Sequence, residues 1–224
     1  MSGLPPLVAL LLACALLTAA CGGGGEKAAS TPKAPAATPT PACEKVPAPA
    51  PKRVKLPKPT TVLDAKKTYV ARVLTNCGEF DITLDAKRAP KTGGSFKYLV
   101  DKRFYDGLGF HRIVAGFVIQ GGDPKGDGSG GPGYKVVEAP PKSLQYTKGV
   151  VAMAKTQLEA AGTSGSQFFV VTAEDANLPP DYALLGRVTS GQDVVDTIGV
   201  AETDQNTEAP LQPIVISKVS VIAK

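Results

Sequence analysis

Short runs of branched and aromatic residues, separated by glycine-rich turns, recur from residue 69 to the end of the chain. The run at 69–74 and the alternating run at 80–84 flank a turn at 76–78, and this arrangement predicts a β-hairpin. Many short strands with few helices limit the fold to a mainly β closed barrel or sandwich. Further strands are expected at 109–120, 149–154, 166–172, 183–188 and 213–223.

Two segments have the pattern of helices. Residues 91–102 place their apolar side chains on one face, and Thr92 is the expected N-cap. Residues 192–198 predict a second, shorter helix.

Residues 22–59 differ in composition from the rest of the chain. They contain nine prolines and seven Lys or Arg against two Glu, whereas residues 60–224 hold 18 basic and 18 acidic residues. Such a segment cannot bury a core. We therefore expect a basic Pro/Ala-rich tether at 21–60 and one folded domain at 61–224. The tether is interpreted as a solvated linker, and contact with an anionic membrane or wall polymer is the alternative.

The N-terminal end has the pattern of an export signal. Residues 7–20 form an apolar run that is too short for a comfortable membrane span. Two alanines lead into Cys21, and four glycines follow it. This resembles a bacterial lipoprotein signal, which predicts a signal peptide at 1–20, a lipid on Cys21 and a place on the outer face of the cytoplasmic membrane. A plain secretory signal cleaved near Ala20 is the alternative.

If the chain is exported and Cys21 carries lipid, two cysteines remain in an oxidising compartment. An even pair there predicts a disulfide between Cys43 and Cys77. Two free thiols are the alternative.

Several classes of site are disfavoured. The chain has one histidine, His111, which we interpret as structural, so a Ser-His-Asp hydrolase or a zinc site with several histidines is excluded. The glycine-rich stretch at 121–133 lacks the Gly-Lys-Ser/Thr ending of a phosphate loop and the closing Glu of a calcium hand. We expect no metal, no cofactor and no nucleic acid.

Arg112 is the residue that most needs an explanation. It lies in the apolar segment 110–120, which is broken at Ala115-Gly116. A charged side chain in such a run requires a partner or a function. With Gln120 and Gln167 it would offer polar groups on one face of neighbouring strands. A structural carboxylate paired to Arg112 is the alternative.

Two blocks resemble the signature of the cyclophilins. They are FHRIVAGFVIQGGDP at 110–124 and GSQFFV at 165–170, and shorter matching blocks appear in order between 104 and 188. The resemblance implies an eight-stranded antiparallel barrel capped by two helices. It also implies peptidyl-prolyl cis-trans isomerase activity on proline-containing peptides and unfolded exported proteins. A peptide-binding chaperone and a solute-binding lipoprotein are the alternative functions.

The resemblance also assigns roles to residues. Arg112 would donate to the prolyl nitrogen of the twisted amide, and Gln120 would help to orient Arg112 and the substrate backbone. The residues expected to bind the peptide and the proline ring are Phe117, Val118, Ala154, Lys155, Gln167, Phe169, Leu178 and Tyr182.

The rim of the expected groove departs from the family. Asn177 stands where cyclosporin binding in the family relies on a tryptophan, and this chain has none. The segment 155–162 is longer than its usual counterpart. We therefore expect weak cyclosporin binding with retained turnover of proline peptides.

Overall fold

The computed structural model of the chain describes residues 43–224. The predicted signal peptide at 1–20 and the predicted lipidation site at Cys21 lie outside these residues. Within 43–224, no helix has the length and apolar character needed to cross a membrane.

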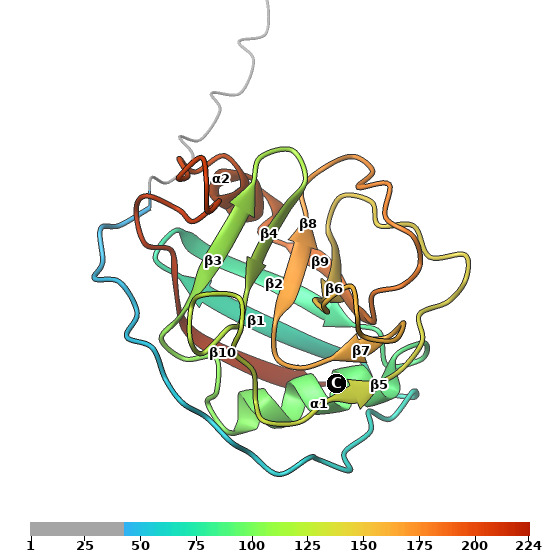
Figure 1. Cartoon of the computed structure of the whole chain (residues 1–224). Coiled ribbons are helices and arrows are strands. Elements are labelled where there is room, and N and C mark those ends of the chain that lie inside the picture. Colours follow the sequence, from blue (N-terminus) through green and yellow to red (C-terminus); the bar gives the residue numbers. More distant parts are fainter. Residues whose placement is uncertain (1–42) are drawn as a thin grey trace, which may run out of the picture. The chain divides into compact units, whose positions relative to one another are not determined.

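Eight strands of the described part close into one antiparallel barrel with two helices, which confirms the predicted fold (Figure 1). The order around the barrel is β1-β10-β3-β4-β8-β6-β9-β2, and the short strands β5 and β7 pair with each other. The helices α1 and α2 lie at opposite ends of the barrel in this view. The elements are β1 (Tyr69–Thr75), β2 (Gly78–Leu84), α1 (Pro90–Asp101), β3 (Leu108–Val114), β4 (Val118–Gly121), β5 (Val136–Val137), β6 (Val150–Met153), β7 (Thr163–Ser164), β8 (Phe168–Val171), β9 (Leu184–Ser190), α2 (Gln192–Gly199) and β10 (Val215–Ala223).

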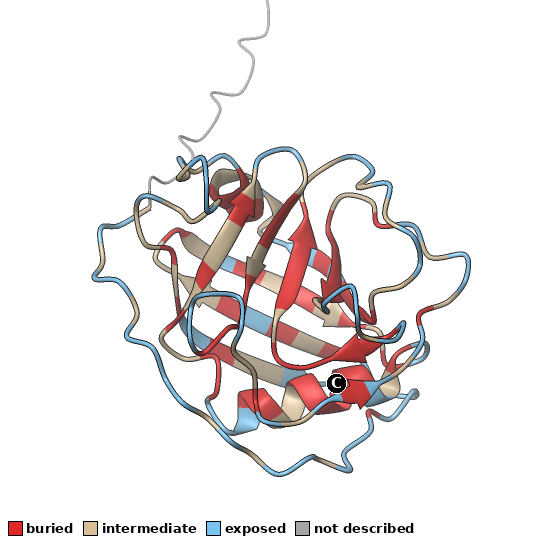
Figure 2. Ribbon diagram, viewed as in Figure 1, coloured by how far each residue is buried: buried red, intermediate tan, exposed pale blue. Residues whose placement is uncertain are grey.

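The first hairpin shows how alternation fills the barrel. Val73 on β1 and its cross-strand partner Phe80 on β2 are buried, as is Ile82. Arg72 and Asp81 face the other way and form an ion pair of 3.0 Å. Because successive side chains of a strand point to opposite faces, one face joins the core and the other meets water. The same striping of buried and less buried positions is visible in Figure 2.

Helix α1 starts slightly earlier than predicted and is capped differently. Pro90 occupies its first turn, where a missing N–H and a fixed φ are tolerated. Thr92, the expected N-cap, is buried inside the helix, so that expectation was wrong. The backbone N–H groups of Lys91 and Thr92 instead donate to the carboxylate of Glu138, at 3.1 and 2.7 Å. A carboxylate 46 residues away from Thr92 thus satisfies the helix start.

Residues 43–60, which we name the strap, differ from the free tether expected at 21–60. The strap contains no helix or strand and runs along the outside of the barrel (Figure 1). A disulfide between Cys43 and Cys77, as predicted, fastens its first residue to the hairpin of β1 and β2. The packed part of the described chain therefore includes residues 43–60, ahead of the boundary predicted at 61.

Hydrogen bonds and apolar contacts hold the rest of the strap. The N–H of Lys52 donates to the carbonyl of Pro124 at 2.7 Å, and that of Leu56 to Pro132 at 2.8 Å. Val54 and Leu56 pack against the barrel core. Prolines keep a chain extended without internal hydrogen bonds, which leaves the intervening N–H groups for the barrel. Composition alone does not reveal this docking.

Candidate active site

A groove on the outside of the barrel brings the predicted site residues together. It lies over β3, β4 and β8 and has a volume of about 290 Å³. Gln167 lines an adjoining depression of about 340 Å³, which also contains Gln120. The other predicted residues all line the groove, and they are Arg112, Phe117, Val118, Gln120, Ala154, Lys155, Phe169, Leu178 and Tyr182.

The floor of the groove consists of apolar residues on the outer face of the barrel. Val118 on β4 and Phe169 on β8 line the groove, and with Ala152 on β6 they belong to a buried cluster that is separate from the barrel core. An apolar outer face needs a cover to exclude water. The loops that follow β5 and β8 cover one side of this cluster through Tyr146 and Tyr182.

An aromatic corner forms the inner wall. The rings of Phe169 and Tyr182 meet edge to face at 5.4 Å between centroids. The hydroxyl of Tyr146 donates to the carbonyl of Tyr182 at 2.6 Å and accepts from its N–H at 3.0 Å. Burial raises the pKa of Tyr146 to about 12, which favours the protonated hydroxyl that makes these bonds. Sequence reasoning missed Tyr146, because no local pattern marks a tyrosine that bonds to a backbone 36 residues away.

Arg112 stands at the polar end of the groove, and its charge is paired. Its Nε donates to Oε2 of Glu208 at 2.5 Å, and the two side chains are 35% and 43% exposed. Arg112 therefore has the carboxylate partner that the alternative interpretation required, and it also lines the groove. Sequence reasoning missed Glu208, which lies 96 residues further along the chain.

The amides of the site are bonded to each other. Gln120 is the cross-strand neighbour of Arg112, but its Nε2 donates to Gln167 at 3.0 Å. No side-chain hydrogen bond joins Gln120 to Arg112 within residues 43–224. Gln167 in turn donates to the carbonyls of Gly128 and Gly130, at 2.8 and 2.9 Å. The glycine-rich loop therefore fixes the amides, while Arg112 is held from elsewhere.

Lys155 is a buried cation that holds one wall of the groove. Its side chain is 4% exposed, and its Nζ lies 2.6 Å from Oδ2 of Asp181. The same Nζ donates to the carbonyl of Glu159 at 3.1 Å and lies 5.5 Å from the ring centre of Tyr182. A cation this buried needs such partners. The side chain of Lys155 is thus engaged by Asp181 and by the longer segment 155–162.

Asn177 lies just before Leu178 at the rim. Its φ is 52°, a left-handed conformation that asparagine tolerates better than most residues. Its N–H donates to the side chain of Asp175 at 2.8 Å, so this part of the rim is a tight local turn. Asn177 does not line the groove.

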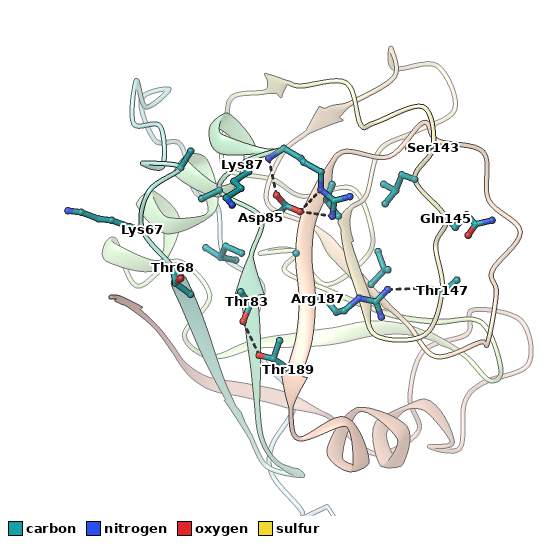
Figure 3. A pocket seen from close by; sticks show the side chains of 18 residues that line it. Lys67, Thr68, Thr83, Asp85, Lys87, Ser143, Gln145, Thr147, Arg187 and Thr189 are labelled. Atoms are coloured by element: carbon teal, nitrogen blue, oxygen red, sulfur yellow. Dashed lines mark hydrogen bonds and ion pairs between the residues drawn. The ribbon is translucent and has the colours of Figure 1, made fainter.

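Another depression, of about 520 Å³, lies beside β2 and β9 (Figure 3). Arg88 pairs with Asp85 at 2.6 Å. Arg187 donates to the carbonyl of Lys148 at 2.7 Å and to the hydroxyl of Thr147 at 3.1 Å. Local partners occupy both arginines, and none of the predicted site residues lines this depression, so the groove remains the candidate.

His111 also lies away from the groove. It lines a depression of about 210 Å³ together with residues of the strap. Burial lowers its pKa, and neither ring nitrogen has a hydrogen-bond partner within residues 43–224. This position fits the structural interpretation of His111.

Comparisons with known proteins agree with this geometry. The family model described as "Cyclophilin type peptidyl-prolyl cis-trans isomerase/CLD" matches residues 70–221. The chain is 38% identical to peptidyl-prolyl cis-trans isomerase B of Streptomyces anulatus, over 67% of this chain and 95% of that protein. It is 37% identical to probable peptidyl-prolyl cis-trans isomerase A of Mycobacterium leprae, over 67% and 91%. A Cryptosporidium parvum cyclophilin type isomerase, solved in the presence of the dipeptide Ala-Pro, matches with a TM-score of 0.64 at 29% identity, over 68% of this chain and 98% of that one.

Proposed function

Because this chain belongs to the family of cyclophilin-type peptidyl-prolyl cis-trans isomerases, we propose that it accelerates X-Pro bond rotation in exported proteins and that Arg112 stabilises the twisted amide. The enzyme class follows from the family and from the two actinobacterial relatives. The substrates are proline-containing segments of proteins that fold after export.

The reaction requires a hydrogen-bond donor and an apolar pocket, and it requires no nucleophile. Rotation about an X-Pro bond is slow because the amide is conjugated, with a barrier of about 18–20 kcal/mol. In the twisted state the prolyl nitrogen regains a lone pair and accepts a hydrogen bond. An enzyme that binds this state better than either planar form lowers the barrier without a covalent intermediate.

One observation supports this proposal most strongly. The groove places the guanidinium of Arg112 at the polar end of a pocket whose floor is formed by Phe117, Val118 and Phe169. A proline ring seated on that floor leaves its nitrogen toward the polar end. Arg112 then donates to the nitrogen, and the amides of Gln120 and Gln167 lie beside the peptide backbone.

The test is the rate of cis-to-trans conversion of a short proline peptide. Arg112→Ala should remove most of the activity without unfolding the chain, and Arg112→Lys should rescue poorly because lysine lacks the planar fork. Arg187→Ala, outside the groove, is the matched control and should be as active as the wild type. A folded Arg112→Ala chain with undiminished activity contradicts the role of Arg112.

The export part of the proposal rests on the N-terminal sequence and on the disulfide. The apolar run and the small residues before Cys21 have the pattern of a lipoprotein signal. A bonded Cys43–Cys77 pair supports an oxidising compartment. Mass spectrometry of the mature N-terminus should find a diacylglyceryl-modified Cys21 in the membrane fraction. An unmodified N-terminus on protein free in the medium contradicts the anchor.

A further inference from the structure

The contact that holds Arg112 comes from the loop between α2 and β10, residues 200–214, which we name the Glu208 loop. Within residues 43–224, the hydrogen bond from Arg112 Nε to Glu208 is the side-chain contact that fixes the guanidinium. The two amides beside it are bonded to each other and to the glycine-rich loop. Glu208, rather than Gln120, is therefore the residue in position to orient the guanidinium of Arg112.

The Glu208 loop is built to hold one carboxylate in place. Oδ1 of Asp204 accepts hydrogen bonds from the N–H groups of Asn206 and Thr207, both at 2.9 Å, and from the Thr207 hydroxyl at 3.0 Å. These bonds lower the pKa of Asp204, because they favour the charged form of the carboxylate that organises the turn. Thr203 and Pro210 form a bridge that closes the base of the loop.

The backbone of Glu208 is fixed on both sides. Its N–H donates to the carbonyl of Asp204 at 2.9 Å, and its own carbonyl accepts from the N–H of Ile113 at 2.8 Å. Ile113 is the neighbour of Arg112 on β3, so the loop is bonded to the strand that carries the arginine. The φ of Glu208 is 59°, a left-handed conformation that glutamate adopts at a cost. Strained backbone of this kind persists where the surroundings impose it, and it is common at functional sites.

The hydrogen bond from Arg112 Nε to Glu208 determines which N–H donors of the guanidinium remain for a substrate. A guanidinium has five N–H donors in a rigid plane, and the four on the two terminal nitrogens are left free when Nε is bonded. A bond at Nε also fixes the rotation of that plane about the side chain. We propose that Glu208 is a positioning residue, which holds Arg112 by Nε so that its terminal nitrogens face the prolyl nitrogen in the groove. The inference rests on the proposed function of Arg112.

The experiment measures kcat and KM for a short proline peptide with the mature chain. Glu208→Asn suits the left-handed backbone but its side chain is too short to reach Nε. It should lower kcat about tenfold, the size expected for loss of one charge-assisted hydrogen bond, with KM changed by less than about twofold. Glu208→Gln keeps the reach and an acceptor oxygen, and it should recover at least half of kcat. Glu202→Gln, in the same loop, should match the wild type.

Two further measurements separate this inference from the proposed function. In an Arg112→Ala background, Glu208→Asn should have no additional effect. The NMR signal of Arg112 Nε–H should be shifted and protected from exchange in the wild type, and should lose both properties in Glu208→Asn.

A Glu208→Asn chain with wild-type kcat and an unchanged Nε–H signal overturns the inference. A Glu208→Asn chain with raised kcat also overturns the inference, because the Glu208 carboxylate would then hold Arg112 away from its active position. A wild-type chain that shows the shifted and protected Nε–H signal but no isomerase activity instead overturns the proposed function. In that case the hydrogen bond between Arg112 and Glu208 is still confirmed.

Discussion

Removing the Cys43–Cys77 disulfide tests whether the strap is part of the folded domain. The two cysteines are 34 residues apart in sequence, and Cys77 is buried. The loop-entropy relation gives about 3.8 kcal/mol at 25 °C for a closed loop of this length. The double variant Cys43→Ala/Cys77→Ala should therefore lose about 3–4 kcal/mol of unfolding free energy, which corresponds to a fall in Tm of roughly 6–16 °C for a domain of this size.

Urea unfolding followed by circular dichroism measures this loss, with no reductant present. Wild-type protein unfolded in reductant should give the same free energy as the double variant. Trypsin adds a local measurement, because the strap carries Lys45, Lys52 and Arg53, which docking should protect. A loss below about 1 kcal/mol in unfolding free energy, together with unchanged protection of the strap, would refute the reasoning. The disulfide would then contribute little to the stability of the domain or to the docking of the strap.

Three further outcomes follow, two from the groove and one from His111, which lies away from it. Tyr146→Phe leaves the N–H and carbonyl of Tyr182 without their partner, so it should cost about 1–3 kcal/mol in urea unfolding and raise KM for a proline peptide; unchanged stability and KM would contradict the role of that hydroxyl. Because burial lowers the pKa of His111, the unfolded chain binds more protons in the range where the histidine titrates, and unfolding free energy should rise between about pH 5 and 7. His111→Gln should flatten that slope, and an unaltered slope would place the titration elsewhere. Cyclosporin should inhibit weakly while peptide turnover is retained, and Asn177→Trp should partly restore inhibition at a backbone cost of about 1–2 kcal/mol, because its φ is 52°; tight inhibition of the unmodified chain would contradict this.

Alternation at 80–84 and runs of branched and apolar residues elsewhere were enough to predict where the barrel strands lie. The two signature blocks carry Arg112, Gln120 and Phe169, whereas the groove residues Ala154, Lys155, Leu178 and Tyr182 lie outside these blocks and were expected from the wider resemblance. Arg112, Gln120 and Phe169 come together because β3, β4 and β8 are neighbours in the barrel, and those strands carry the blocks.

The missed residues act through contacts that span long stretches of sequence. Glu208 reaches Arg112 from a loop, and Glu138 caps α1 from a distant turn. Tyr146 bonds to the backbone of Tyr182, 36 residues further along the chain. Each is a common residue type in an irregular segment, and only the closure of the barrel places it. The strap was missed for a related reason, because a proline-rich segment reveals its lack of a core but not the surface that accepts its N–H groups.

In the proposed mechanism Arg112 lowers the barrier to rotation rather than simply binding the peptide. Exchange NMR on a proline peptide at equilibrium measures both quantities, because line positions report binding and cis–trans exchange peaks report rotation. We predict that Arg112→Ala keeps peptide affinity within a fewfold of the wild type and loses the catalysed exchange. Exchange that persists at the wild-type rate on the bound variant would contradict the account.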